Sequence, residues 1–266
     1  MSSNDRFKSA HLKICRGLEF INEIDKDLSE KRPFRYILET NAKAGQRTTY
    51  AERDEALLDA LSLKCGDAVQ NLCAGIDHAY TAVVKPFAKT DKEARNIQFP
   101  FSATSDRLKE ACHNRLAHRV STEFRDAIMA LKPHGEAEGN KTLYFMSALN
   151  NPDKHASLIP IGYYLSVVVG DMRKQIPDFM MGMPSDSTMA VAQNCRDFSW
   201  DCKPFTMNDW VVNKVPANGI LKQEVTVPVD VCFQGRDMSG EMLTVPTLRQ
   251  FYDVANYVVD VISKYS

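Results

Sequence analysis

Several polar side chains lie close together in the stretch GDAVQNLCAGIDHAY, residues 66–80. Two carboxylates, one carboxamide and one imidazole can exchange hydrogen bonds or protons, so the stretch could hold a ligand or perform acid–base chemistry. The simpler interpretation is a helix with one buried face and one solvated face. The four candidate residues are Asp67, Asn71, Asp77 and His78.

A second polar group follows in LNNPDKHASL, residues 149–158. Asn and Asp beside a proline are also common in turns and helix caps, so a purely structural interpretation stays open. Because buried polar side chains need partners, we expect this group to meet the polar face of the first stretch. A small ligand pocket at that junction is the weaker expectation. The candidate residues here are Asn151, Asp153, Lys154 and His155.

Basic side chains recur in DRLKEACHNRLAHRVSTEFRD, residues 106–126, which reads as part of one helix from about residue 106 to 131. Such a stripe could contact phosphate groups, or it could be a solvated face whose acidic neighbours dilute its charge. The candidate phosphate contacts are Arg107, Arg115, Arg119 and Arg125.

Four segments resemble, in order, a poorly characterised group of bacterial proteins. That group carries a GDalhNLRsaLDH-type helix, an FPI segment, an LqPY segment and an NxDKHR segment. The matching segments here are LSLKCGDAVQNLCAGIDHAY, FPF, ALKP and LNNPDKHASLIPI, and the resemblance covers residues 34–161. The matched residues are Gly66, Asp67, Asn71, Leu72, Asp77, His78, Asn151, Asp153, Lys154 and His155.

The RsaLDH element of that group resembles the R-x4-H pattern of HEPN-type helical domains, many of which cleave RNA. The resemblance implies a histidine, His78 or His155, as general acid or base, and an arginine that holds phosphate. The sequence departs from the pattern, because Cys73 and Ala156 stand where the group has arginines. A neutral thiol cannot hold a phosphate as a guanidinium does, so we expect no cleavage of RNA.

The elements that position these residues follow from hydrophobic spacing. We expect helices at about residues 8–30, 63–84 and 141–150, a β-hairpin near 34–53, and a closing helix that begins near Pro246. Gly75 in the middle of a helix suggests that another element approaches closely there. Later segments read as strands. Alternation over residues 219–236 predicts one antiparallel strand with four inward valines, namely Val225, Val227, Val229 and Val231.

These elements predict an α+β fold with a helical N-terminal half, an antiparallel sheet that combines the early hairpin with C-terminal strands, and a closing C-terminal helix. We expect a mainly helical region at residues 1–156 and strands plus the helix at 157–266, in one compact domain.

Composition excludes several classes of protein. The 266 residues carry a formal net charge of -1, which argues against a surface covered by nucleic-acid contacts. No apolar run approaches the roughly 18 to 20 residues of a membrane span, and no secretory signal is visible, so we expect a cytoplasmic protein. The seven cysteines form no CxxC pair, and we expect no metal and no cofactor.

The function that we favour from sequence is a binding or assembly module without catalysis, for an unknown small ligand or protein partner. One alternative is a HEPN-like ribonuclease or nucleotide-processing protein that binds RNA, with a role in defence. Another is a structural homodimer.

Overall fold

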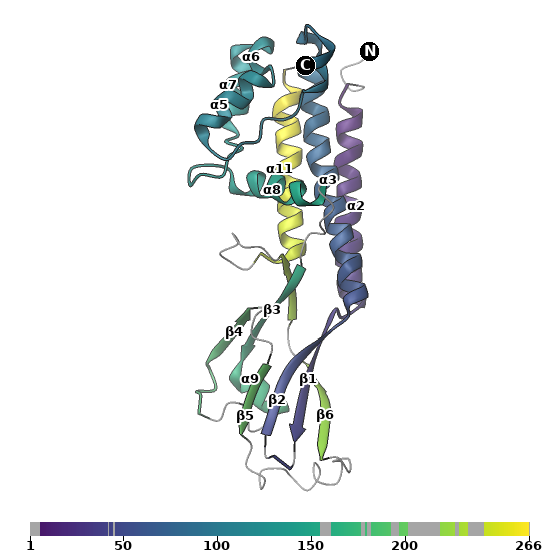
Figure 1. Cartoon of the computed structure of the whole chain (residues 1–266), viewed down its shortest axis with the longest axis vertical. Coiled ribbons are helices and arrows are strands. Elements are labelled where there is room, and N and C mark those ends of the chain that lie inside the picture. Colours follow the sequence, from purple (N-terminus) through teal and green to yellow (C-terminus); the bar gives the residue numbers. More distant parts are fainter. Residues whose placement is uncertain are drawn as a thin grey trace. The chain divides into compact units, whose positions relative to one another are not determined.

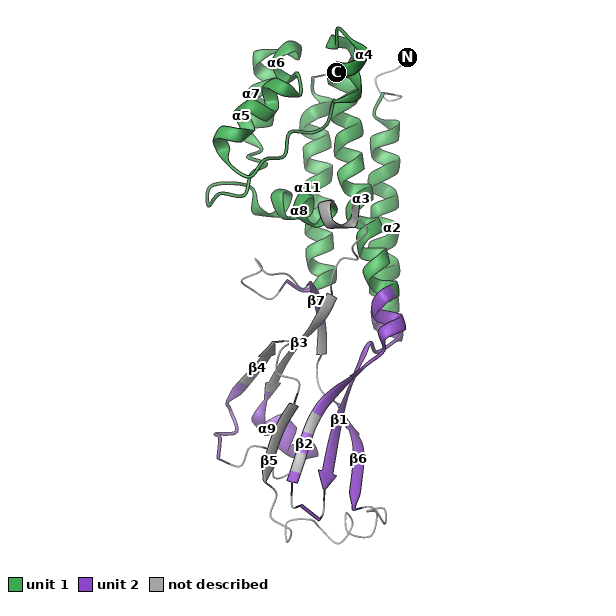
Figure 2. Cartoon of the chain, viewed as in Figure 1, with its two compact units in different colours: residues 1–27, 60–159, 244–266 green, residues 28–59, 160–243 purple. Residues whose placement is uncertain are grey.

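The computed structural model describes most of the chain. Its described residues are 6–41, 43–44, 46–154, 161–176, 179, 182–192, 197–201, 219–226, 229–233 and 242–265. The chain divides into two compact units, which Figure 2 distinguishes by colour. Each unit draws on separate stretches of the chain, rather than meeting at the single division expected near residue 156. Unit 1 comprises residues 1–27, 60–159 and 244–266, and unit 2 comprises residues 28–59 and 160–243.

In the described part of the chain, unit 1 holds the greater part of each of three long helices (Figure 1). They are α2 (Lys8–Glu30), α3 (Glu55–Val84) and α11 (Thr244–Ser263), which confirms the expected helices, although α3 begins well before residue 63. Shorter helices follow α3 along the chain: α4 (Asp91–Arg95), α5 (Ser105–Asn114), α6 (Ala117–Val120), α7 (Thr122–Ala130) and α8 (Lys141–Lys154).

Two glycines allow α2 and α3 to pack at close range. A Cβ atom added to Gly17 would lie 2.8 Å from Cδ2 of Leu72. One added to Gly75 would lie 2.6 Å from Cγ1 of Ile14. Both separations are well below the carbon–carbon contact distance of about 3.5–4.0 Å, so a side chain at either glycine would force its neighbour to move. The expected close approach at Gly75 is therefore confirmed.

The apolar face of α3 lies in the core, as its spacing predicts. Phe87, which follows the helix, is 41% exposed. The α-helix ends at Val84, and Lys85–Phe87 forms a 3-10 turn around Pro86, because proline cannot continue the helical hydrogen bonds. The buried residues of this face are Val69, Leu72, Cys73, Ile76, Tyr80 and Val83.

The single helix expected from residue 106 to 131 is wrong, because this segment forms α5, α6 and α7. Leu116 adopts a left-handed conformation, with φ of 66°, between α5 and α6. Just before it, the Tyr80 hydroxyl donates a hydrogen bond to the carbonyl of Arg115 at 2.9 Å. Ser121 is extended and its hydroxyl caps the N-terminus of α7. Tertiary contacts and capping thus override the helical periodicity.

Unit 2 contains two antiparallel sheets in its described part, with strand orders β5-β2-β1-β6 and β4-β3-β7. The hairpin expected near residues 34–53 is confirmed as β1 (Phe34–Asn41) paired with β2 (Gln46–Arg53). The other elements are β3 (Ile161–Val168), α9 (Val169–Gln175), β4 (Thr188–Ala192), β5 (Asp197–Asp201), β6 (Ile220–Val225) and β7 (Val229–Phe233).

The single strand expected over residues 219–236 is also wrong, because β6 pairs with β1 and β7 pairs with β3. Pro228 has no N–H to donate to a continuous ladder. At the end of β6, the Gln175 carboxamide makes two hydrogen bonds to the backbone of Thr226. Its Nε2 donates to the carbonyl at 2.8 Å and its Oε1 accepts the N–H at 2.9 Å.

The inward orientation of the valines in this segment holds for the two that are described with their side chains. Val225 and Val231 are each 8% exposed. The side chains of Val227 and Val229 lie outside the described residues.

The α+β fold class is confirmed, with a helical N-terminal half, antiparallel strands and a C-terminal helix. The strands divide between two sheets rather than forming one. None of the described helices has both the length and the apolar character that crossing a lipid bilayer requires.

The close packing of α2 on α3 predicts the effect of Gly75→Ala. The new methyl group would overlap the buried Ile14, and such overpacking costs about 1–3 kcal/mol. Alanine has a better helix propensity than glycine, which stabilises the folded state by about 1 kcal/mol. We expect a net loss of about 1 kcal/mol in the free energy of unfolding, measured by urea denaturation. Gly182→Ala is the matched control, since nothing lies within 4 Å of its added Cβ. A Gly75→Ala variant as stable as the control would contradict this packing.

Candidate functional site

Asp77 holds the segment of residues 97–101 on α3. Its Oδ1 accepts the backbone N–H of Phe99 at 2.8 Å. The Phe99 ring is buried and packs edge-on against Tyr80 and Phe101, with centroid separations of 5.9 and 4.9 Å. Asp77, a candidate binding residue from sequence, therefore helps to hold this segment in place. It also lines a cavity.

This cavity has a volume of about 510 Å³ and lies entirely within unit 1. Residues 98–103 line it, together with Cys73 and Asp77 of α3 and with Ser147 and Asn150 of α8. The spacing of each helical pair places both residues on one face of their helix. Ligand sites typically enclose about 300–1,000 Å³, so the cavity is large enough for a small molecule. The residues from α5 are Arg107, Glu110, Ala111 and Asn114, and Arg115 follows them.

Asn150 gives the cavity a buried amide. The residue is 5% exposed, and its Oδ1 has no hydrogen-bond partner among the described residues. Most buried polar side-chain atoms in folded proteins are paired with protein or ordered water. The amide also interrupts the apolar face of α8, which otherwise buries Leu143, Met146 and Leu149. A buried amide oxygen without a partner beside a cavity therefore indicates a site for a ligand that donates a hydrogen bond.

Cys73 occupies a position that cannot accommodate an arginine without disruption. Its side chain is 2% exposed, and its thiol lies 3.9 Å from the carbonyl of Met146, to which it donates a weak hydrogen bond. This contact ties α3 to α8. A guanidinium at position 73 would need a paired anion, because burying an uncompensated charge is very costly.

The polar face of α3 borders α2 rather than the cavity. Nδ1 of His78 lies 2.7 Å from the hydroxyl of Ser9, and Oδ1 of Asn71 accepts a hydrogen bond from Nζ of Lys13 at 3.3 Å. His78 and Asp67 are exposed and Asn71 is half-buried. These side chains therefore form a solvent-accessible edge where α2 meets α3, which is close to the simpler interpretation of the stretch.

The second polar group is only partly described. The backbone of Asn151, Asp153 and Lys154 belongs to α8, which runs past Pro152. Their side chains, and the whole of His155, lie outside the described residues. The expected contact between this group and the polar face of α3 therefore stays a prediction. The described partners of His78 and Asn71 come from α2.

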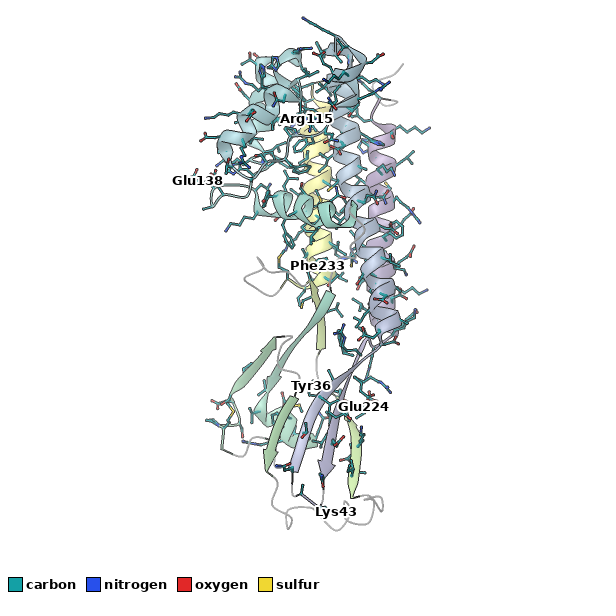
Figure 3. All side chains as sticks on the ribbon, viewed as in Figure 1. Tyr36, Lys43, Arg115, Glu138, Glu224 and Phe233 are labelled. Atoms are coloured by element: carbon teal, nitrogen blue, oxygen red, sulfur yellow. The ribbon has the colours of Figure 1, made fainter. Side chains whose placement is uncertain are left out.

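Two of the four candidate phosphate arginines are paired with carboxylates. Arg119 forms two hydrogen bonds of 2.8 Å with Glu93, and Arg125 lies 2.8 Å from Asp126. Arg115 donates a hydrogen bond to the carbonyl of Asn96. Within the described residues, neither Arg107 nor Arg115 has a carboxylate partner, and both line the cavity (Arg115 is labelled in Figure 3). The structure thus separates the expected basic stripe into paired and unpaired arginines.

Sequence reasoning missed several lining residues, namely Gln98, Glu110, Asn114 and Ser147, and did not count Asn150 among the site residues. A usable signal was present in α8, where Asn150 falls on a face of otherwise apolar residues. The spacing of Arg107, Glu110 and Asn114 also places them on one face of α5. Among the described residues, no three His, Cys, Asp or Glu side chains are arranged as metal ligands.

The Arg119–Glu93 pair predicts a dependence of stability on acidic pH. The bonds from Arg119 and from the Lys89 N–H hold the pKa of Glu93 at about 2, below its ordinary value of 4.5. A lowered folded-state pKa stabilises the fold above pH 4.5, and this contribution is lost as pH falls toward 2. We expect Glu93→Gln to flatten the decline in stability over that window, measured by urea denaturation at each pH. Asp126→Asn, in a more exposed pair, is the control. An unchanged pH profile for Glu93→Gln would rule out this linkage.

Comparisons with known proteins give no further lead to function. No family model, no curated protein and no solved structure matches the chain.

Proposed function

We propose that the chain is a binding module without catalysis, which takes up a small polar ligand in the cavity of unit 1. The observation that carries this proposal is the buried Asn150, whose Oδ1 has no hydrogen-bond partner among the described residues. Leaving a buried acceptor unpaired costs about 1–3 kcal/mol, a cost that a ligand donor would remove. Residues at functional sites commonly lower the stability of the folded protein in this way.

The position of His78, one of the two expected catalytic histidines, supports binding rather than catalysis. The imidazole of His78 is exposed and lies against Ser9 of α2, and no histidine is among the described residues that line the cavity. Cys73 is buried where the resembling group has its arginine. The cation expected for stabilising a phosphoryl transition state is therefore missing from that position.

We place this module in the cytoplasm of a bacterial cell. The bacterial origin rests on the resemblance described from the sequence. The reducing compartment is supported by the described cysteines, Cys15, Cys65, Cys73, Cys112 and Cys232, which are all free thiols.

The proposal predicts that Asn150→Leu separates binding from stability. Leucine has the same branched arrangement of heavy atoms and no polar atom, so we expect the free energy of unfolding to stay the same or rise. Ligand binding should be lost. The measurement is the thermal unfolding midpoint in the presence of neutral, anionic, cationic and zwitterionic metabolites, because a ligand of the folded state raises it. Asn71→Leu, outside the cavity, is the matched control and should keep binding. If no metabolite raises the midpoint of the wild-type protein, the proposal fails.

The ribonuclease alternative has its own test. We expect no cleavage of labelled single-stranded RNA by the wild-type protein above the level of a His78→Ala variant, because the arginine position holds Cys73. Gel electrophoresis of the RNA after incubation gives the answer. Cleavage that disappears in His78→Ala would show that the protein is an enzyme.

A further inference from the structure

We infer that the ligand of the cavity is a zwitterion, a small acid that also carries an amino group. This inference rests on the proposed function and adds the chemical class of the ligand. It follows from which charges line the cavity and which of them are already paired.

Two guanidinium groups are positioned to bind the anionic end of the ligand. Arg107 and Arg115 line the cavity, and neither has a carboxylate partner in the described part of the chain. Their neighbours Arg119 and Arg125 do have such partners and do not line it. A planar guanidinium presents donors in a geometry that matches carboxylate and phosphate oxygens. An acidic group of the ligand therefore fits between or beside these two side chains.

The backbone N–H groups at the start of α5 do not bind the acidic group of the ligand. The N–H of Arg107 is bonded to the Thr104 hydroxyl at 3.3 Å, and the N–H of Ser105 is bonded to Glu136 at 2.8 Å. Helix N-termini bind anions through such N–H groups when they are vacant. These two N–H groups are occupied and residues 104–106 do not line the cavity, so we assign the anion to the arginine side chains.

Hydrogen-bond acceptors that line the same cavity would bind the cationic end of the ligand. Glu110 lies three residues after Arg107 on α5, and the two make no described ion pair with each other. The carboxylate of Glu110 is therefore the charged acceptor of this end. Asn150 adds the unpaired Oδ1. An ammonium group supplies three N–H donors and a positive charge to this set.

Charge balance explains why both ends are needed. The lining holds two arginines and two carboxylates. A bare anion would also meet the carboxylates, and a bare cation would also meet the arginines, so neither ligand complements both kinds of charge. A ligand with both charges, held apart in one small molecule, complements the two arginines and Glu110 together.

Matched pairs of metabolites test this class directly by isothermal titration calorimetry. The pairs are L-glutamate with 2-oxoglutarate, glucosamine 6-phosphate with glucose 6-phosphate, and O-phosphoethanolamine with ethyl phosphate. Each pair keeps the acid and removes the amine. We expect at least one amino compound to bind at least tenfold more tightly than its partner.

Two variants that each remove one charge test the two ends of the site separately. Arg107→Gln should weaken the bound amino compound about tenfold, through the lost contact with its acid. Glu110→Gln should reduce the preference for the amino compound over its matched acid. Arg95→Gln, an exposed arginine of α4 that does not line the cavity, is the control and should change neither value.

The outcomes separate this inference from the function on which it rests. If the acids without an amine bind as tightly as the amino compounds, the zwitterion is wrong while the binding module stands. Binding of neutral or purely cationic metabolites alone would likewise overturn the zwitterion and leave the binding module standing. If no metabolite of any class binds the wild-type protein, both proposals are overturned.

Discussion

The packing of α2 against α3 through two glycines is the contact on which the arrangement of unit 1 depends. Gly17 and Gly75 bring the two backbones together, so Leu72 and Ile14 fill the space that a side chain would otherwise occupy. Close-packed interiors leave little freedom to shift once such a contact forms. α2 therefore covers one side of α3, and the polar side chains His78 and Asn71 border it.

The remaining sides of α3 hold the walls of the cavity through three hydrogen bonds. Cys73 contacts the carbonyl of Met146 in α8, Asp77 receives the N–H of Phe99, and Tyr80 reaches the carbonyl of Arg115 after α5. These three residues lie within about two turns of one helix. Burial raises the pKa of the Tyr80 hydroxyl, so it stays protonated and able to donate its hydrogen bond. One short segment of α3 thus positions all three walls.

Local patterns predicted those parts of the fold that local physics determines. Hydrophobic spacing located α2, α11 and the buried face of α3, and β-branched residues located the hairpin. The break at Leu116 depends on a hydrogen bond from a distant tyrosine, and the division of β6 from β7 depends on pairing with different strands, so neither is visible in a local window. The site shows the same limit. Asp77, Arg107 and Arg115 were named from residue type, but their common cavity required three separate helices to meet.

The interleaving of the two units has a consequence for synthesis on the ribosome. α11 belongs to unit 1 but follows all of unit 2 along the chain, and it contacts α7 and α8. Its ring of Phe251 lies 5.8 Å from that of Phe145, and Leu248 and Val258 are buried. A nascent chain that has emerged only as far as residue 243 therefore exposes the apolar surfaces that α11 later covers. Such exposed apolar surface is prone to aggregation until α11 emerges, and a chain truncated at this point would keep it exposed.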